Sequence, residues 1–158
     1  MRINVLFVCL GNICRSPMAE AIFQKLVDEA GLRDKFQVDS AGTGSWHVGE
    51  KAHPGTRAIL AEHGIRYHGR SRQVTAKDLA DPQTYIITMD QSNSNDLVRT
   101  FGNHPNLHRL LDFARETAVS DVPDPYYTNN FEYVYQLITD GCVKSYNQHK
   151  RQSAQHLL

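Results

Sequence analysis

The chain is organised around residues 8–17, VCLGNICRSP. They follow Ile3–Val8, a short apolar and β-branched run that is typical of a buried strand. They end in Ser16 and Pro17, a favoured helix N-cap and a favoured first helical residue. The sequence therefore predicts a strand, a tight loop over Cys9–Arg15 and a helix that begins at about Pro17.

The predicted loop has the features of an oxyanion site. A loop that leads into a helix N-terminus directs backbone N–H groups at one point, and the helix dipole adds partial positive charge there. Arg15 adds a planar guanidinium that matches phosphate bidentately. Gly11 lets the backbone come close to the anion, and Asn12 tolerates the positive φ that a tight loop of this kind requires.

Cys9 stands at the end of the predicted strand and faces the same point. Backbone N–H groups and Arg15 stabilise a thiolate, which is the nucleophilic form of cysteine. Ser16 is placed to donate a hydrogen bond to the sulfur. A cysteine at the end of a buried strand is also commonly a small apolar core residue, but its setting here favours a nucleophile directed at a bound phosphorus atom.

Composition sets the broad class of the protein. The length of 158 residues predicts one domain over residues 1–158 with a sizeable core. The chain has 17 Lys and Arg against 17 Asp and Glu, so no overall charge argues for nucleic acid or an acidic membrane. The basic segment His63–Arg72 is predicted to be a solvated loop or helix end. Three cysteines without a secretory signal predict free thiols in a reducing cytoplasm.

Four stretches resemble, in order, the motifs of the low-molecular-weight protein tyrosine phosphatases. They are CLGNICRSPMAE at 9–20, DSAGT at 39–43, MDQSN at 89–93 and DPYY at 124–127. The resemblance runs from about Ile3 to the last helix. It implies an enzyme that hydrolyses phosphotyrosine in proteins, and small aryl phosphates, through a phosphocysteine intermediate. It also implies a tyrosine-phosphorylated protein as substrate, inorganic phosphate as product and inhibitor, and no cofactor.

The order of elements predicts an α/β fold. Strands are expected at 3–8, 36–39, 85–89 and 108–111, and helices at 17–30, at 54–63, from a cap at Asp90 or Ser92 to about Phe101, and from about Phe131 onward. This alternation indicates a three-layer αβα sandwich with a four-stranded parallel sheet. The family resemblance adds a flavodoxin-like strand order of 2-1-3-4. Residues 112–130 are expected to be a long loop, and such loops are usually functional.

The resemblance assigns roles to particular residues. A cysteine phosphatase needs a carboxylic acid that protonates the leaving oxygen. From the residues alone Asp121 and Asp124 are nearly equal candidates, and the resemblance implies that Asp124 is the general acid and then the general base. The backbone of Leu10, Gly11, Asn12, Ile13 and Cys14 is expected to bind phosphate together with Arg15. Trp46, Tyr126 and Tyr127, with Leu10 and Ile13, are expected to wall the substrate ring.

The remaining expectations concern the residues that support the loop, metal binding and the second cysteine of the loop. The resemblance implies that Asn12 and Ser40 belong to a hydrogen-bond network that holds the loop, with Ser16 beside the sulfur. The eight histidines show no metal-ligand spacing, so we expect no metal and mainly surface positions. Cys14 is either a small residue that fills the loop or a redox partner that traps oxidised Cys9 as a disulfide.

Three rival functions remain open. Phosphoarginine phosphatases of the same family tend to have Thr where this chain has Ile13, which favours an aryl phosphate. Arsenate reductases of this fold need further cysteines, and this chain has none between Cys14 and Cys142. A phosphocysteine carrier module needs neither Arg15 nor Asp124, and both are present.

Overall fold

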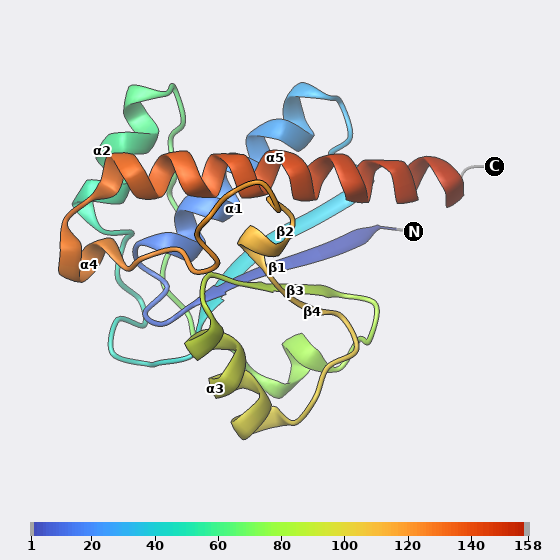
Figure 1. The fold of residues 1–158 in the computed structure, drawn as a ribbon, viewed down its shortest axis with the longest axis horizontal. Coiled ribbons are helices and arrows are strands. Elements are labelled where there is room, and N and C mark those ends of the chain that lie inside the picture. Colours follow the sequence, from blue (N-terminus) through green and yellow to red (C-terminus); the bar gives the residue numbers. More distant parts are fainter. Residues whose placement is uncertain (1, 157–158) are drawn as a thin grey trace.

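The sheet is built around the strand that precedes the loop. The computed structural model describes residues 2–156. β1 (Ile3–Cys9) pairs in parallel with β2 (Phe36–Gly42) on one side and β3 (Tyr85–Thr88) on the other, and β4 (Leu107–Arg109) extends the sheet beyond β3. The strand order is β2-β1-β3-β4, which confirms the expected four-stranded parallel sheet (Figure 1).

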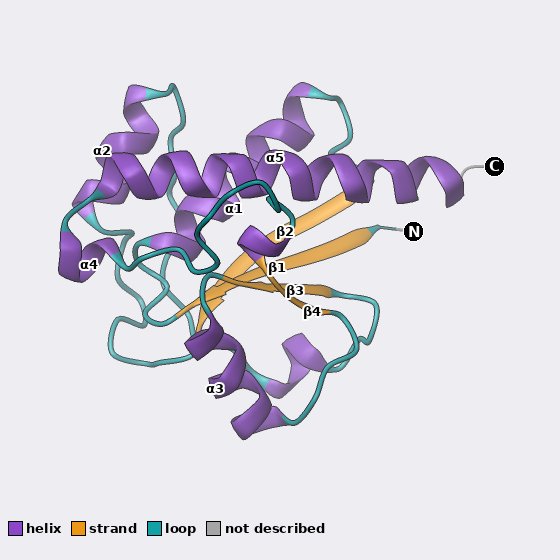
Figure 2. Cartoon of the chain, viewed as in Figure 1, coloured by secondary structure: helices purple, strands orange, loops and turns teal. Residues whose placement is uncertain are grey.

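Helices cover both faces of this sheet (Figure 2). One face carries α1 (Arg15–Glu29), α2 (Pro54–Glu62) and α5 (Phe131–His156), and the other carries α3 (Gln91–Phe101) and the short 3₁₀ helix η1 (Ala76–Leu79). β1 is buried on both sides: Val5 and Phe7 join the larger core, and Leu6 and Val8 join the smaller one. This arrangement confirms the three-layer sandwich and explains why β1 is almost continuously apolar.

The carboxyl ends of the parallel strands meet at one edge of the sheet, where ligands bind in folds of this class. Cys9 is the last residue of β1, and Asp90 caps the helix that follows β3. The chain beyond β2 stays attached to this edge, because the Thr43 N–H donates to the Cys9 carbonyl at 2.9 Å. Residues far apart in the sequence therefore gather around the end of β1.

The predicted fourth strand is misplaced. The sequence predicts a strand at residues 108–111, whereas β4 ends at Arg109 and the chain turns into the 3₁₀ helix η2 (Leu110–Asp112). Leu110 and Leu111 are both buried in the larger core. The turn brings two successive apolar side chains into that core, which an extended strand cannot do because its side chains alternate.

The last helix, α5, begins at Phe131 as predicted. Val134, Ile138 and Cys142 are fully buried and form the stripe by which α5 covers the sheet. Spacings of four residues place them on one face of the helix. No helix in the described part of the chain, residues 2–156, combines the length and the apolar character needed to cross a membrane.

His149 on α5 is fully buried, which contradicts the expectation of mainly surface histidines for this residue. Its ring lies among aromatic rings, 4.0 Å from Tyr85 and 5.6 Å from Phe113 between ring centroids. Neither ring nitrogen has a hydrogen-bond partner among the described residues. Burial, together with the nearby His108, lowers the pKa of His149 to about 4, so the imidazole is neutral in the folded protein at pH 7.

We expect His149 to make the protein acid-sensitive. The folded-state pKa lies below the ordinary 6.5, so the unfolded chain binds the proton first and stability falls as the pH drops from about 6.5 to about 4. His149→Phe should remove roughly 2 kcal/mol of the loss in unfolding free energy between pH 7 and pH 5. Urea unfolding at both pH values measures this. The exposed His68→Phe variant is the control and should behave like the wild type; equal pH dependence in all three proteins would contradict the prediction.

Candidate active site

The loop between β1 and α1 curls around the sulfur of Cys9. Asn12 has a φ of 56°, the left-handed conformation predicted for it. Its N–H donates to the Cys9 Sγ at 3.3 Å, and the Ser16 Oγ lies 3.0 Å from the same sulfur. Hydrogen bonds of this kind stabilise a thiolate.

The side chain of Asn12 lies behind the loop and not in the pocket. Its Nδ2 donates to the Ser16 Oγ at 2.7 Å and to the Ser40 Oγ at 3.0 Å. Its Oδ1 accepts from the Arg72 N–H at 3.0 Å. Asn12 is 2% exposed, so this buried amide is satisfied entirely by protein groups. It ties the loop to α1, to β2 and to the segment at Arg72.

Ser16 does not cap α1, which corrects the sequence prediction. The helix begins at Arg15, and Cys14 occupies the N-cap position without a side-chain cap. The Ser16 hydroxyl instead contacts the sulfur of Cys9 and accepts from Asn12. Serine is a favoured N-cap residue in general, but here its hydroxyl contacts groups of the loop and does not cap the helix.

The sequence analysis did not predict three residues that support the loop from behind: Glu20, Tyr67 and Arg72. Ser40 Oγ donates to Glu20 Oε1 at 2.6 Å, and the Tyr67 hydroxyl donates to the same oxygen at 2.8 Å. Burial raises the pKa of Glu20, and these two hydrogen bonds oppose that shift. Tyr67 and Arg72 belong to the segment expected to be solvated, whereas Glu20 lies within a quoted motif.

Arg15 is the buried cation of the site, at 2% exposed. Its Nη1 donates to Asp90 Oδ2 at 2.6 Å and to the Val122 carbonyl at 2.9 Å. Its Nη2 donates to Asp124 Oδ2 at 3.4 Å. Its Nε is buried and has no hydrogen-bond partner among the described residues. Nε and Nη2 form one edge of the guanidinium, so the edge suited to a bidentate oxyanion has fewer protein partners than Nη1.

The charges around Arg15 keep it ionised. Burial lowers the pKa of the guanidinium, but the negative charges of Cys9, Asp124 and Asp90 outweigh it, so the net pKa lies above the usual value. Asp90 both holds Arg15 and caps α3, because its Oδ1 accepts from the Asn93 N–H at 2.8 Å. The carboxylate that positions the guanidinium is itself fixed by a helix N-terminus.

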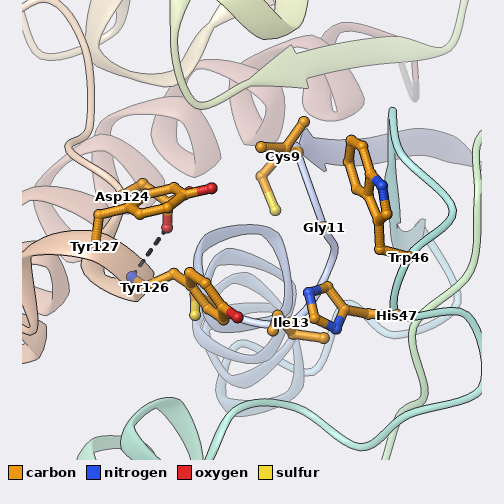
Figure 3. Close-up of a pocket in the computed structure, with 10 residues that line it drawn as sticks. Cys9, Gly11, Ile13, Trp46, His47, Asp124, Tyr126 and Tyr127 are labelled. Atoms are coloured by element: carbon orange, nitrogen blue, oxygen red, sulfur yellow. Dashed lines mark hydrogen bonds between the residues drawn. The ribbon is translucent and has the colours of Figure 1, made fainter.

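A pocket of about 350 Å³ opens above the sulfur (Figure 3). Its lining brings together most of the predicted substrate-binding residues: Cys9, Leu10, Gly11, Ile13, Cys14, Trp46, Asp124, Tyr126 and Tyr127, with His47 in addition. Trp46 stands on one side of the pocket, and Asp124 and Tyr127 stand on the other. A Cβ on Gly11 would lie 2.9 Å from His47 Cδ2, so glycine also makes room for the histidine.

The structure separates the two candidate acids. Asp124 lines the pocket and caps the short helix α4 (Pro125–Thr128), and its Oδ1 accepts from the Tyr126 N–H at 3.1 Å (Figure 3). Asp121 lies outside the pocket, where it accepts from the Gln91 N–H at 3.0 Å. The expected long loop therefore contains a helical turn that directs Asp124 toward Arg15.

The rim of the pocket is aromatic and open to solvent. Trp46 is 71% exposed, Tyr127 74% and Tyr126 51%. The rings of Tyr126 and Tyr127 meet edge to face with centroids 5.2 Å apart. Three exposed aromatic side chains around one opening are suited to contact an aromatic ligand.

The cysteines differ in their environments. All three are free thiols. Burial, with the negative charges of Asp124 and Cys9, raises the pKa of Cys14 to about 12. Burial also raises the pKa of Cys142, which contacts the Ala19 carbonyl in the core. Cys9 is therefore the thiol whose surroundings fit a nucleophile.

Side chains that can bind a metal come together at a different place. Within residues 2–156, Glu62, His63 and Glu132 have ligand atoms within 4.8 Å of one another. All three are exposed at the junction of α2 and α5, and none lines the pocket.

Alkylation should distinguish the thiols. Iodoacetamide at pH 7 is expected to modify Cys9 in the pocket, because Cys14 is a neutral thiol with a pKa of about 12 and Cys142 is fully buried. Peptide mapping by mass spectrometry measures the labelling of each cysteine. Cys9→Ser should lose the label, and comparable labelling of Cys14 in the native protein would contradict the prediction.

Comparison with known proteins agrees with this geometry. The family model for low molecular weight phosphotyrosine protein phosphatase matches residues 4–155. The low molecular weight protein-tyrosine-phosphatase YfkJ of Bacillus subtilis is 53% identical over 143 residues, covering 89% of this chain and 91% of the relative. The crystal structure of YfkJ matches with a TM-score of 0.92 and 49% identity, covering 96% of this chain and 97% of that one.

Two further relatives bear on the breadth of the match. PtpA of Staphylococcus saprophyticus, also named a low molecular weight protein-tyrosine-phosphatase, is 48% identical over 141 residues, 89% of each chain. The crystal structure of a Drosophila arginine phosphatase is 33% identical with a TM-score of 0.83, covering 95% of this chain and 98% of that one. The fold is thus shared by proteins whose names state different phosphorylated residues.

Proposed function

The chain belongs to the low molecular weight phosphotyrosine protein phosphatase family, and from that premise we propose which residues carry the activity and how. The enzyme is a protein tyrosine phosphatase that works through a phosphocysteine on Cys9. Arg15 and the loop N–H groups bind the phosphate, and Asp124 serves as general acid and then as general base.

The edge of Arg15 formed by Nε and Nη2 carries the proposal. Asp90 and the Val122 carbonyl accept from Nη1, whereas the buried Nε has no partner among residues 2–156. A buried donor without a partner is costly, and two oxygens of a phosphate satisfy Nε and Nη2 together. Asp124 pairs with Nη2 at 3.4 Å, so a phosphate in this position displaces a weak contact.

The first step transfers the phosphoryl group to sulfur. The Cys9 thiolate attacks phosphorus in line, the S–P bond forms and the bond from phosphorus to the phenolic oxygen breaks. Asp124 gives its proton to that oxygen, so tyrosine leaves as a neutral phenol. The transition state is loose, and Arg15 and the loop N–H groups stabilise the charge on the equatorial oxygens.

The second step returns the enzyme to its starting state. Asp124, now ionised, takes a proton from water as the water oxygen attacks phosphorus. The S–P bond breaks and Cys9 departs as a thiolate, which the Ser16 hydroxyl 3.0 Å away stabilises. Inorganic phosphate is the product, and it inhibits because it fits the same site.

The aromatic rim supports an aryl ester as substrate. Phosphotyrosine places its ring between Trp46 on one side and Tyr126 and Tyr127 on the other. Leu10 and Ile13 give this pocket an apolar base around the sulfur. A seryl phosphate is too short to bring the peptide backbone to this rim while its phosphate reaches Arg15.

The remaining features of the proposal concern the setting. We propose that the enzyme acts in the cytoplasm on tyrosine-phosphorylated proteins, without metal or cofactor, and without binding nucleic acid or membrane. The equal number of acidic and basic residues supports the last part. The second candidate is a phosphoarginine phosphatase, which the similarity to the Drosophila arginine phosphatase favours.

The other two rivals are weaker. An arsenate reductase needs additional accessible cysteines, and Cys142 is fully buried in α5. A phosphocysteine carrier needs no leaving-group acid, whereas Asp124 lines the pocket beside Arg15.

A substrate panel tests the activity. With chelator present, we expect rapid turnover of a phosphotyrosine peptide, and little of a phosphoserine peptide or of phosphoarginine, because the rim suits an aryl group. Phosphate release measures turnover. Cys9→Ser should abolish it, and preference for phosphoarginine would assign the second candidate function instead.

Exchanging the two aspartates tests the acid. Asp124→Ala should lower kcat on phenyl phosphate by roughly 10²–10⁴-fold, because a poor leaving group needs the proton. The loss should shrink with p-nitrophenyl phosphate, whose leaving group is already stable. Asp121→Ala is the matched control and should retain activity. Asp124→Asn keeps a side-chain oxygen that can cap α4 but removes the acid, so it should lose activity as Asp124→Ala does. Normal turnover in Asp124→Ala with loss in Asp121→Ala would exchange the roles.

A further inference from the structure

A second cavity lies beside the catalytic pocket. It holds about 280 Å³, and Leu10 and Trp46 line both cavities. The mechanism above makes no use of it. Since the catalytic pocket takes the phosphorylated side chain, whatever occupies this second space lies directly next to that side chain. We call it the flanking cavity.

The wall between the two cavities is fixed to the phosphate loop. The Gly44 N–H donates to the Leu10 carbonyl at 2.8 Å. The Trp46 indole packs directly on Gly44, where a Cβ would lie 1.9 Å from the Trp46 Cζ3. Only glycine at this position leaves room for the indole. Trp46 therefore separates the two cavities, and its exposed surface is accessible to a substrate chain.

The lining of the flanking cavity combines apolar side chains with the uncharged polar side chains of Thr43, Gln73 and Thr100. Leu97 and Phe101 of α3 contribute apolar side chains to it. Its two charged residues, Asp96 and Arg99, form an ion pair with each other. A charged ligand group therefore gains little there and loses its hydration, whereas an apolar side chain removes its surface from water.

We propose that the flanking cavity binds an uncharged apolar side chain of the substrate protein, next to the phosphotyrosine. This inference rests on the proposed phosphotyrosine activity. The cavity continues the catalytic pocket across a shared wall, and its size suits one side chain better than a separate ligand. Successive side chains of an extended peptide point to opposite sides, so a close neighbour of the phosphotyrosine passes over Trp46 into the flanking cavity.

Phosphopeptides that differ at one position test this. Leu, Gly or Glu is placed in turn at each of the two positions on either side of the phosphotyrosine. At one of these positions we expect kcat/KM for Leu to exceed that for Gly by about tenfold, with Glu no better than Gly. No preference at any of the four positions would overturn the proposal.

Variants on the exposed surface of α3 locate the effect. Thr100 lines the flanking cavity, so Thr100→Trp should fill it and abolish the preference for Leu, and Phe101→Ala should reduce it. Asn95→Trp, on the same helix but outside both cavities, is the control and should keep the preference. A preference that survives Thr100→Trp, or that disappears equally in Asn95→Trp, would overturn the proposal.

Turnover of p-nitrophenyl phosphate separates the two levels of inference. This substrate reaches only the catalytic pocket, so all three variants should hydrolyse it at the wild-type rate. If p-nitrophenyl phosphate and the phosphotyrosine peptides are both hydrolysed, but the rate for the peptides does not depend on the residue beside the phosphotyrosine, then only the proposed role of the flanking cavity is wrong. If no phosphotyrosine peptide is hydrolysed, the proposed function fails and this inference fails with it.

Discussion

The buried guanidinium of Arg15 is the constraint on which the site depends. A cation at 2% exposure requires compensating groups, and removing one partner of a buried charge pair typically costs about 3–5 kcal/mol. Its compensation comes from Asp90 after β3, and from the Val122 carbonyl and Asp124 before α4. The contacts of one side chain in α1 therefore position two other segments of the chain. Nε has no partner among the described residues, and this is where the proposed phosphate would bind.

Local signals in the sequence predicted the parts of the site that lie close together in the chain. The apolar run of β1, the positive φ of Asn12 and the place of Cys9 follow from steric and burial rules that act over a few residues. The strand order and the choice of Asp124 over Asp121 came from the family resemblance, since spacing alone left both open. Two local predictions failed because tertiary contacts decided the structure. The Ser16 hydroxyl contacts the Cys9 sulfur and does not cap the helix. Leu110 begins a 3₁₀ helix that buries its side chain, so β4 ends earlier than predicted.

The parts that escaped prediction depend on long-range contacts. The Arg72 N–H supports Asn12 across 60 residues, and the Tyr67 hydroxyl reaches Glu20 across 47. A basic, polar segment gives no sign that it will pack behind a loop near the start of the chain. His149 is a similar case, because its burial follows from the aromatic rings that the fold gathers around it. In each case tertiary structure creates the environment, and the residue type alone does not reveal it.

The distances along the chain between Arg15 and its carboxylates have a consequence for the protein during its synthesis. Asp90 follows Arg15 by 75 residues and Asp124 follows it by 109. A growing chain on the ribosome therefore carries Cys9 and Arg15 long before it carries the carboxylates that pair with Arg15. Until the segment through Asp124 has emerged, the guanidinium lacks one of its carboxylate partners, and the proposed reaction lacks the acid that protonates the leaving phenol. All four strands precede Asp124 in the chain, so a nascent chain that ends before this residue contains the whole sheet but lacks the proposed general acid. On the proposed mechanism, activity therefore arrives only after the sheet has been made.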